Sequence, residues 1–306
     1  MRLPDIQIRD PFVLPVEGEQ AFYLFGTTDR NAWKGPGTGF DCYRSADLDE
    51  WQGPLAAFRP PDGFWATTQF WAPEVHLYRD RYYMLASFKS PHRRRGTQIL
   101  AADRPGGPYL PWSGGPVTPP EWECLDGTLH VDSGNRPWMV FCHEWLQAGD
   151  GTIAAIPLTR DLRKADGPAE VLFRASSAPW ARALTGLNPA DFATGEPFDP
   201  DLPRYVTDGP FLHRTASGTL LMLWSSFGDR GYAMGLTRSE SGSLRGPWTQ
   251  QAEPLWPHDG GHGMLFSDFN GRLFLTLHQP NKSPHERAVF REVLEAGDTL
   301  RLAGTA

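Results

Sequence analysis

Three aspartates of this sequence lie in short turn-like motifs, and together they could perform acid–base chemistry. They are Asp10, which Pro follows, and Asp126 and Asp208, which Gly follows. Each precedes an apolar strand-like segment by a similar number of residues, so we expect the three carboxyl groups at equivalent positions of a repeated fold, facing one axis. Carboxyl groups held close together repel one another and lose hydration, which spreads their pKa values and can supply both an acid and a base. The alternative is that each aspartate only caps a turn.

A repeated apolar strand would position these side chains. Strand-like segments recur at residues 22–26, 82–86, 138–142, 220–224 and 273–277. A polar motif precedes each of them, and a further strand and turn follow most of them. Repeats of about 50 to 80 residues, each with four short strands, predict an all-β fold, a five-bladed β-propeller. A β-sandwich is the alternative interpretation.

Residues that directly follow the repeated strands should surround the same pocket, because the second strand of each repeat returns antiparallel to the level where the first began. The polar and aromatic residues at these positions include His143, Glu144, Trp224, Ser225 and His278. Hydrogen-bonding groups beside flat aromatic faces suit a sugar. No Gly-rich phosphate loop accompanies them, so the pattern favours hydrolysis of a glycosidic bond.

The third repeat is longer than the others. Its excess, residues 175–205, is rich in Pro, Gly, Asp and small residues, and this composition predicts a long loop. Long loops of compact folds often form lids or pocket walls. We expect this one to close one end of the cleft, with Trp180 at its rim, which favours attack on chain ends.

Composition limits the classes of partner. The chain has 306 residues and a formal net charge of −7, which argues against a broad nucleic-acid or anionic lipid surface. Residues 92–95 form the one basic run, which we interpret as a solvated loop. No apolar run reaches membrane-spanning length, residues 1–5 lack the apolar core that a secretion signal carries, and the 3 cysteines are far apart, so we expect a soluble cytoplasmic protein without disulfides. We expect one domain over residues 1–306.

The motifs together resemble glycoside hydrolase family 43, from Ile8 to about Val293. They are Ile8-Arg9-Asp10-Pro11-Phe12 with Tyr23-Leu24-Phe25-Gly26-Thr27, Phe70-Trp71-Ala72-Pro73-Glu74-Val75, Leu125-Asp126-Gly127, Thr207-Asp208-Gly209-Pro210-Phe211-Leu212 and Gly261-His262-Gly263. Each motif is weak alone, but the set in this order is fairly specific. The resemblance implies a five-bladed propeller that hydrolyses arabinofuranosides, xylosides or some galactosides with inversion.

The resemblance also assigns catalytic roles. Asp10 would be the general base that activates water, and Asp126 would orient and tune the proton donor. The family's general acid is a Glu in a Glu-Gly-Pro motif, and here that position is Asp208, whose side chain is one methylene shorter. Glu144, which the antiparallel second strand places on the same rim, is a competing proton donor, and His143 would orient whichever of the two acts. The sequence favours neither Asp208 nor Glu144 as the proton donor.

Two further residues match positions of the family. His262 resembles the histidine that helps to hold a water-ligated metal ion, often calcium, in the central channel; no cofactor is required for the chemistry. Trp71 resembles the aromatic wall of the sugar subsite, although a core position between blades is an equally good interpretation.

These observations predict an inverting exo-glycosidase that acts on α-L-arabinofuranosyl, or β-D-xylosyl or galactosyl, ends of oligosaccharides. A catalytically silent carbohydrate-binding propeller is the main alternative, because Asp208 departs from the family pattern. A sugar phosphorylase would require several cationic side chains at the channel, where the motifs supply only Arg9. We expect no nucleic-acid or membrane partner.

Overall fold

The predicted five-bladed propeller is confirmed by five separate four-stranded antiparallel sheets, each formed by consecutive strands. The computed structural model describes residues 1–188, 199 and 202–304. Blade 1 contains β1 (Arg9–Val16), β2 (Ala21–Thr27), β3 (Phe40–Ser45) and β4 (Gln52–Phe58). Blade 2 contains β5 (Thr68–Tyr78), β6 (Arg81–Ser90), β7 (Arg93–Ala102) and β8 (Leu110–Pro116). Blade 3 contains β9 (Cys124–Val131), β10 (Pro137–His143), β11 (Thr152–Pro157) and β12 (Glu170–Arg174).

The remaining two blades have the same organisation. Blade 4 contains β13 (Asp208–Arg214), β14 (Leu220–Gly228), β15 (Gly231–Ser239) and β16 (Trp248–Gln250). Blade 5 contains β17 (Gly261–Ser267), β18 (Leu273–Gln279), β19 (Arg287–Ala296) and β20 (Thr299–Leu302). The described helices are short, namely α1 (Trp145–Ala148) and the 3₁₀ turns η1 (Leu3–Asp5), η2 (Glu17–Glu19) and η3 (Ala175–Ser177). None of them is long and apolar enough to cross a membrane.

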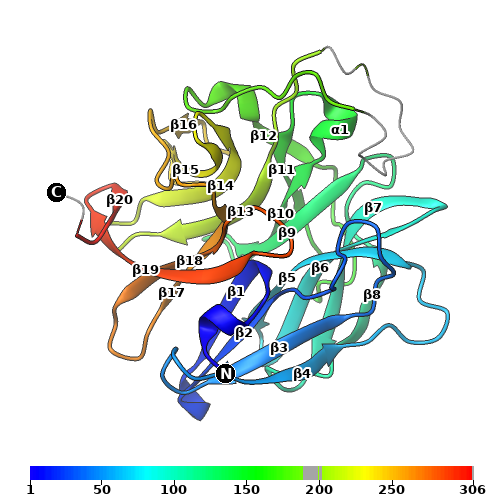
Figure 1. The fold of residues 1–306 in the computed structure, drawn as a ribbon. Coiled ribbons are helices and arrows are strands. Elements are labelled where there is room, and N and C mark those ends of the chain that lie inside the picture. The colour runs from blue at the N-terminus through cyan, green and yellow to red at the C-terminus, as the bar shows by residue number, and fades with distance from the viewer. Residues whose placement is uncertain (189–198, 200–201, 305–306) are drawn as a thin grey trace.

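The blades follow one another around a common centre in chain order, and the orange-red fifth blade lies beside the blue first blade (Figure 1). The chain closes this ring near its N-terminus, where the Ile8 amide donates to the Glu286 carbonyl over 3.3 Å. Gln7, directly before the motif that leads into β1, also forms a bridge with Arg287. The first strand of every blade therefore begins at the centre of a closed ring.

Aromatic and aliphatic side chains fill the space between the blades. Phe40 and Phe58 from blade 1 pack against Phe70 and Phe88 from blade 2, with ring centroids 5.8 to 6.3 Å apart. These rings are fully buried, and burial of large apolar surfaces is the main source of stability in such a fold. Cys42, Cys124 and Cys142 are buried free thiols in the same packing layers, as the sequence predicts.

Candidate active site

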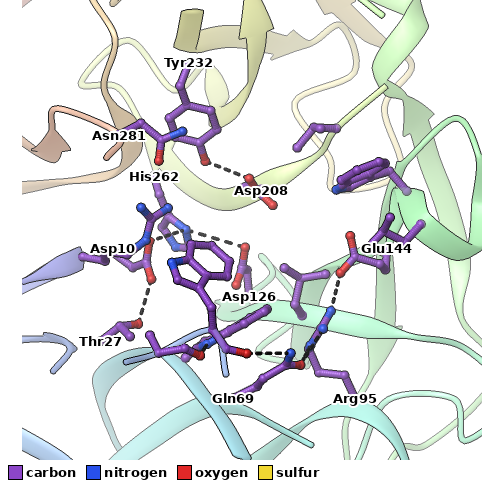
Figure 2. Close-up of a pocket in the computed structure, with 18 of the residues that line it drawn as sticks. Asp10, Thr27, Gln69, Arg95, Asp126, Glu144, Asp208, Tyr232, His262 and Asn281 are labelled. Atoms are coloured by element: carbon purple, nitrogen blue, oxygen red, sulfur yellow. Dashed lines mark hydrogen bonds and ion pairs between the residues drawn. The ribbon is translucent and has the colours of Figure 1, made fainter. Parts of the chain in front are cut away.

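A cavity of about 410 Å³ contains all four carboxyl groups that the sequence selects. Asp10, Asp126, Asp208 and Glu144 line it, each from a different strand or strand end. Figure 2 shows Asp10 and Glu144 on opposite sides, with Asp126 and Asp208 between them. This size is within the usual range for small-molecule sites. The expectation that the Asp motifs meet at one axis is therefore confirmed.

A β-bulge near the start of each inner strand positions these groups. Each first strand shifts register there against its second strand, for example between Arg9 and Phe12 in blade 1. The bulged residue has a left-handed backbone in every blade: Asp10 (φ 51), Ala72 (φ 46), Asp126 (φ 57), Gly209 (φ 51) and His262 (φ 48). A bulge redirects a side chain that regular pleating would place elsewhere, and such features cluster at functional sites.

Side chains of the preceding blade hold most of these strained residues in place. The Ala72 amide donates to Thr27 Oγ1 (2.9 Å), and the Asp126 amide donates to Ser87 Oγ (2.8 Å). In the fourth blade the pattern differs, because the Gly209 amide donates to the carboxyl group of Asp126 itself (3.1 Å). The base of the cavity is thus a ring of hydrogen bonds that runs from blade to blade.

The register corrects one prediction. In blades 1 and 2 the residue directly before the bulge, Arg9 or Trp71, pairs with the second strand at Thr27 or Ser87. Asp208 makes the equivalent pair with Ser225 in blade 4, so it lies one residue before the bulged position. Asp10 and Asp126 are equivalent, whereas Asp208 is not equivalent to them. The carboxyl group of Asp208 still reaches the cavity, because it approaches from the neighbouring position on a different blade.

Asp10 is held as a carboxylate. Its Oδ2 accepts a hydrogen bond from Thr27 Oγ1 (2.7 Å), and its Oδ1 lies 3.2 Å from His262 Nδ1. Burial acts to raise the pKa of Asp10, but the charges of His262 and Arg9 outweigh burial and hold this pKa below its usual value. An ionised, hydrogen-bonded carboxylate is suited to accept a proton from water.

The pKa values of Asp126 and Asp208 are shifted in the opposite direction, above their usual values. Burial and the charge of Asp10 raise the pKa of Asp126 well above its usual value. Burial and the charges of Asp126 and Glu144 raise the pKa of Asp208 to about 8. Tyr232 donates its hydroxyl to Asp208 Oδ2 over 2.9 Å, which leaves the other oxygen to carry a proton. The cavity therefore combines a base with a protonated carboxylic acid at neutral pH.

Glu144 lies in a buried ion-pair network. Its Oε2 pairs with Arg95, whose guanidinium also donates to Gln69 Oε1 (2.7 Å) and lies 4.3 Å from the ring centroid of Trp71. Burial raises the pKa of Glu144, while the charge of Arg95 opposes that effect. The interpretation of residues 92–95 as a solvated loop is wrong for Arg95, which is 3% exposed and lines the cavity.

Only one of the five predicted sugar-binding residues lines the cavity, namely Trp71. Trp224 is 0% exposed and packs on Trp180, and its indole N–H donates to Gln250 Oε1 (3.0 Å). The assignment of Trp224 to substrate binding is therefore wrong, because this side chain belongs to the packing between blades.

Three further predicted contacts support the site from beneath or beside it instead of lining it. Ser225 is fully buried and accepts the His262 amide (2.8 Å). His278 is also fully buried and accepts the Asp10 amide through Nδ1 (3.3 Å), and burial and the charge of Arg9 lower its pKa to about 3, so it is neutral. His143 stacks on Trp122 with ring centroids 4.3 Å apart, and its Nε2 bonds to Gln147. Ser225 and His278 thus hold the backbones of His262 and Asp10, whereas His143 packs beside the site on Trp122 and does not line the cavity.

The long segment 175–205 forms part of the wall, but not as predicted in detail. Leu184 lines the cavity beside Trp145, Leu146, Val206 and Phe227. Trp180 is 3% exposed within the core of blades 3 and 4, so its predicted place at the rim is wrong. Residues 189–198 and 200–201 of this segment lie outside the described residues.

The surroundings of His262 do not by themselves form a metal site. Its Nδ1 faces two carboxyl groups, Asp10 at 3.2 Å and Asp126 at 3.6 Å. Within residues 1–188, 199 and 202–304, no group of three His, Cys, Asp or Glu side chains could hold a metal ion. A calcium ion held mainly by water at His262 stays a prediction, and no step of the chemistry below is assigned to it.

Several residues of the cavity carry no recognisable motif in the sequence. Tyr232 lies at the start of β15, Gln69 precedes the Trp71 motif, and Trp33 lies in the connection between β2 and β3. Each reaches the cavity through tertiary contacts from outside the repeated motif. Arg95 follows two other arginines, and only its burial distinguishes it from them.

Comparisons with known proteins agree with this geometry. The sequence model of glycosyl hydrolases family 43 matches residues 5–295. An endo-arabinase from Bacteroides thetaiotaomicron VPI-5482 has a similar structure, with a TM-score of 0.86, 36% identity, and coverage of 97% of this chain and 98% of that chain. No match was found among curated protein sequences.

Two more distant structures share the fold. An endo-1,4-beta-xylanase from the same bacterium has a TM-score of 0.75 at 21% identity and covers 99% of this chain and 96% of its own. An exo-1,5-alpha-L-arabinanase from a bovine ruminal metagenomic library has a TM-score of 0.67 at 17% identity and covers 97% and 96%.

Proposed function

The chain belongs to glycosyl hydrolases family 43, and we propose that it hydrolyses α-L-arabinofuranosyl bonds at the non-reducing ends of arabinan-type oligosaccharides, with inversion. The observation that carries the proposal is the pair of opposite pKa shifts in one cavity, lowered for Asp10 and raised for Asp208. Two carboxyl groups with separated pKa values are the requirement for acid–base hydrolysis of a glycosidic bond.

In the proposed reaction, a water molecule attacks the anomeric carbon while Asp10 takes one of its protons. The bond from the anomeric carbon to the glycosidic oxygen breaks, and Asp208 gives its proton to that oxygen. The new bond forms on the face opposite the departing group, so the anomeric configuration inverts. Exchange with solvent then returns the proton from Asp10 and reprotonates Asp208.

We assign the acid to Asp208 because its carboxyl group has a hydroxyl donor on one oxygen and a raised pKa. Burial also raises the pKa of Glu144, but its Oε2 is paired with Arg95, whose charge opposes that shift. An ionised Glu144 would accept hydrogen bonds from sugar hydroxyls across the cavity from Asp10. The inward approach of Asp208 from the position before the bulge would offset its shorter side chain.

The arabinofuranosyl assignment is supported by the 36% identical structure, which is described as an endo-arabinase. Attack at chain ends is supported by the buried apolar wall of Trp145, Leu146 and Val206, which bounds the cavity on one side. Arg204 donates to the carbonyl oxygens of Trp145 and Leu146 and so fixes this wall.

A substrate panel tests the proposal. Release of nitrophenol from aryl α-L-arabinofuranosides, β-D-xylosides and β-D-galactosides is measured for the wild type, Asp10→Ala, Asp208→Asn and Glu144→Gln. We expect turnover of the arabinofuranoside, abolished by Asp10→Ala. Asp103→Asn is the matched control, because this carboxylate is 83% exposed on the surface.

Two further measurements test the details. An activated aryl leaving group needs little protonation, so loss of the acid should harm natural arabino-oligosaccharides far more than aryl substrates. We expect this contrast for Asp208→Asn and not for Glu144→Gln; the reverse would move the acid to Glu144. With linear arabinan, early appearance of internal fragments instead of released single sugars would refute attack at chain ends. Saturable sugar binding without turnover of any substrate would support the binding-module alternative.

A further inference from the structure

Trp33 is an exposed aromatic side chain at the mouth of the cavity. It is 44% exposed, although it lines the same cavity as Asp10 and Trp71. Single exposed apolar side chains are common on protein surfaces, but among the large ones of the described residues Trp33 is the one that lines this cavity. Its place at the mouth separates it from the deeper, half-buried Trp71.

Contacts from two other blades hold this indole. Its Nε1 donates to Ser283 Oγ over 3.0 Å, from the connection between β18 and β19. Its ring lies edge-on to Trp71, with centroids 5.2 Å apart and an interplanar angle of 66°. Its carbonyl oxygen accepts from Gln69 Nε2 (3.4 Å), and the neighbouring Ala32 carbonyl accepts the Trp71 indole N–H (2.6 Å).

Arg9 covers part of the ring, with its guanidinium carbon 4.9 Å from the ring centroid. Arg9 is itself fixed by Glu286, whose Oε1 lies 2.8 Å from Arg9 Nη1 and also accepts the hydroxyl of Ser283. The same buried carboxylate thus anchors both partners of the indole. Arg9 thus occupies one face of the Trp33 ring, and the exposed area of this side chain belongs to the remainder of the ring.

We propose that Trp33 is the stacking platform for the sugar on the leaving-group side of the scissile bond. The proposal rests on the proposed function, because it takes Asp10, Asp126 and Asp208 to surround the reacting sugar deeper in the cavity. The next sugar of an oligosaccharide must then lie toward the mouth, where Trp33 offers a rigid apolar face. Because its contacts already fix the ring, stacking would cost little side-chain entropy.

Kinetics on two substrates of different length test this role. Methyl α-L-arabinofuranoside has a leaving group too small to reach the mouth, whereas α-1,5-linked arabinotriose places sugars there. We expect Trp33→Ala to lower the ratio of kcat/KM for arabinotriose to that for the methyl glycoside about ten-fold, in line with the energy of an aromatic contact. Trp33→Phe, which keeps a flat face, should recover most of that ratio.

Trp112→Ala is the matched control. This indole also lies under guanidinium groups, 5.1 Å from Arg81 and 3.8 Å from Arg163, and donates its N–H to a backbone carbonyl, but it does not line the cavity. Its substitution should leave the ratio unchanged. An equal loss on both substrates for Trp33→Ala, or no loss on either, would overturn the proposal.

Failure of the proposed function would look different, since the wild type would then turn over neither substrate. Calorimetric titration with arabino-, xylo- and galacto-oligosaccharides of three residues, into Asp10→Ala with and without Trp33→Ala, still decides the role of Trp33 in that case. Weaker binding of a trisaccharide to the double variant would support the platform. Equal affinity of both proteins for every trisaccharide, or binding by neither, would refute it.

Discussion

The protonated state of Asp208 can be tested without any substrate, through the pH dependence of stability in the wild type and in Asp208→Asn. The pKa of this group is raised from 3.8 to about 8 in the folded protein by burial and by its acidic neighbours. Between these two pH values the unfolded chain loses its proton while the folded protein keeps it. The folded state then binds more protons, so the free energy of unfolding falls as pH rises.

The size of the effect follows from the shift. Each pH unit in this window costs the wild type about 1.4 kcal/mol relative to a variant without the group, which amounts to about 4 kcal/mol from pH 5 to pH 8. This is an upper value, because Asp208 keeps partial contact with the water of the cavity. Asp208→Asn should therefore gain stability relative to the wild type as pH rises.

Equilibrium urea unfolding, followed by tryptophan fluorescence at each pH from 5 to 8, measures the difference. The exposed Asp103→Asn should remain parallel to the wild type throughout. The same protonation predicts that kcat/KM of the wild type falls on the alkaline side near pH 8, where Asp208 loses the proton that it donates. Parallel stability profiles for Asp208→Asn and the wild type would mean that Asp208 is ionised, and the assignment of the acid would fail.

The other predictions concern residues that support the site. Thr27→Val removes the hydroxyl that donates to Asp10 and lowers its pKa, so the acidic limb of kcat/KM should move to higher pH, whereas Thr27→Ser should not move it. Trp224→Ala should lower the free energy of unfolding by about 3–5 kcal/mol in urea titrations and leave KM unchanged, since this side chain is core. Gly209→Ala would place a Cβ 2.6 Å from the His262 ring at φ +51, so kcat and Tm should both fall. If His262 helps to hold calcium, addition of calcium to EDTA-treated protein should raise Tm, and His262→Gln should abolish that response.

The five blades could be predicted from the sequence because each repeat combines two independent signals. An apolar strand and a polar motif recur in the same order, and all five sheets have the predicted inner and second strands. The fourth strands were less distinct, since they are partly exposed and carry weaker apolar patterns, as in β4 and β16. Packing between blades, not local propensity, determines where those outer strands lie.

The binding residues were harder to predict because the position at which a strand ends determines which side chain reaches the rim. The sequence pattern ended the fourth repeat strand at Trp224, but β14 continues to Gly228, so Phe227 lines the cavity and Trp224 packs between blades. In blade 5 the residues that line the cavity after β18 are Asn281 and Ser283, beyond the predicted His278. In blades 1 and 3 the second strand ends within one residue of the predicted segment, and there Thr27 and Glu144 line the cavity as expected.

The sequence contains a signal for the register of Asp208, but this signal is missed when the repeats are aligned on their acidic residues. Pro11 and Pro210 both follow the bulged residue directly, so alignment on proline places Asp208 beside Arg9 instead of Asp10. Proline has no amide hydrogen to donate, and a bulge is one of the few places in a sheet where this does no harm. The backbone requirement therefore fixes the register more reliably than the functional group does. A carboxyl group at either of two neighbouring sequence positions can reach the cavity. A proline outside the bulge, in contrast, would remove a backbone hydrogen bond between the first and second strands.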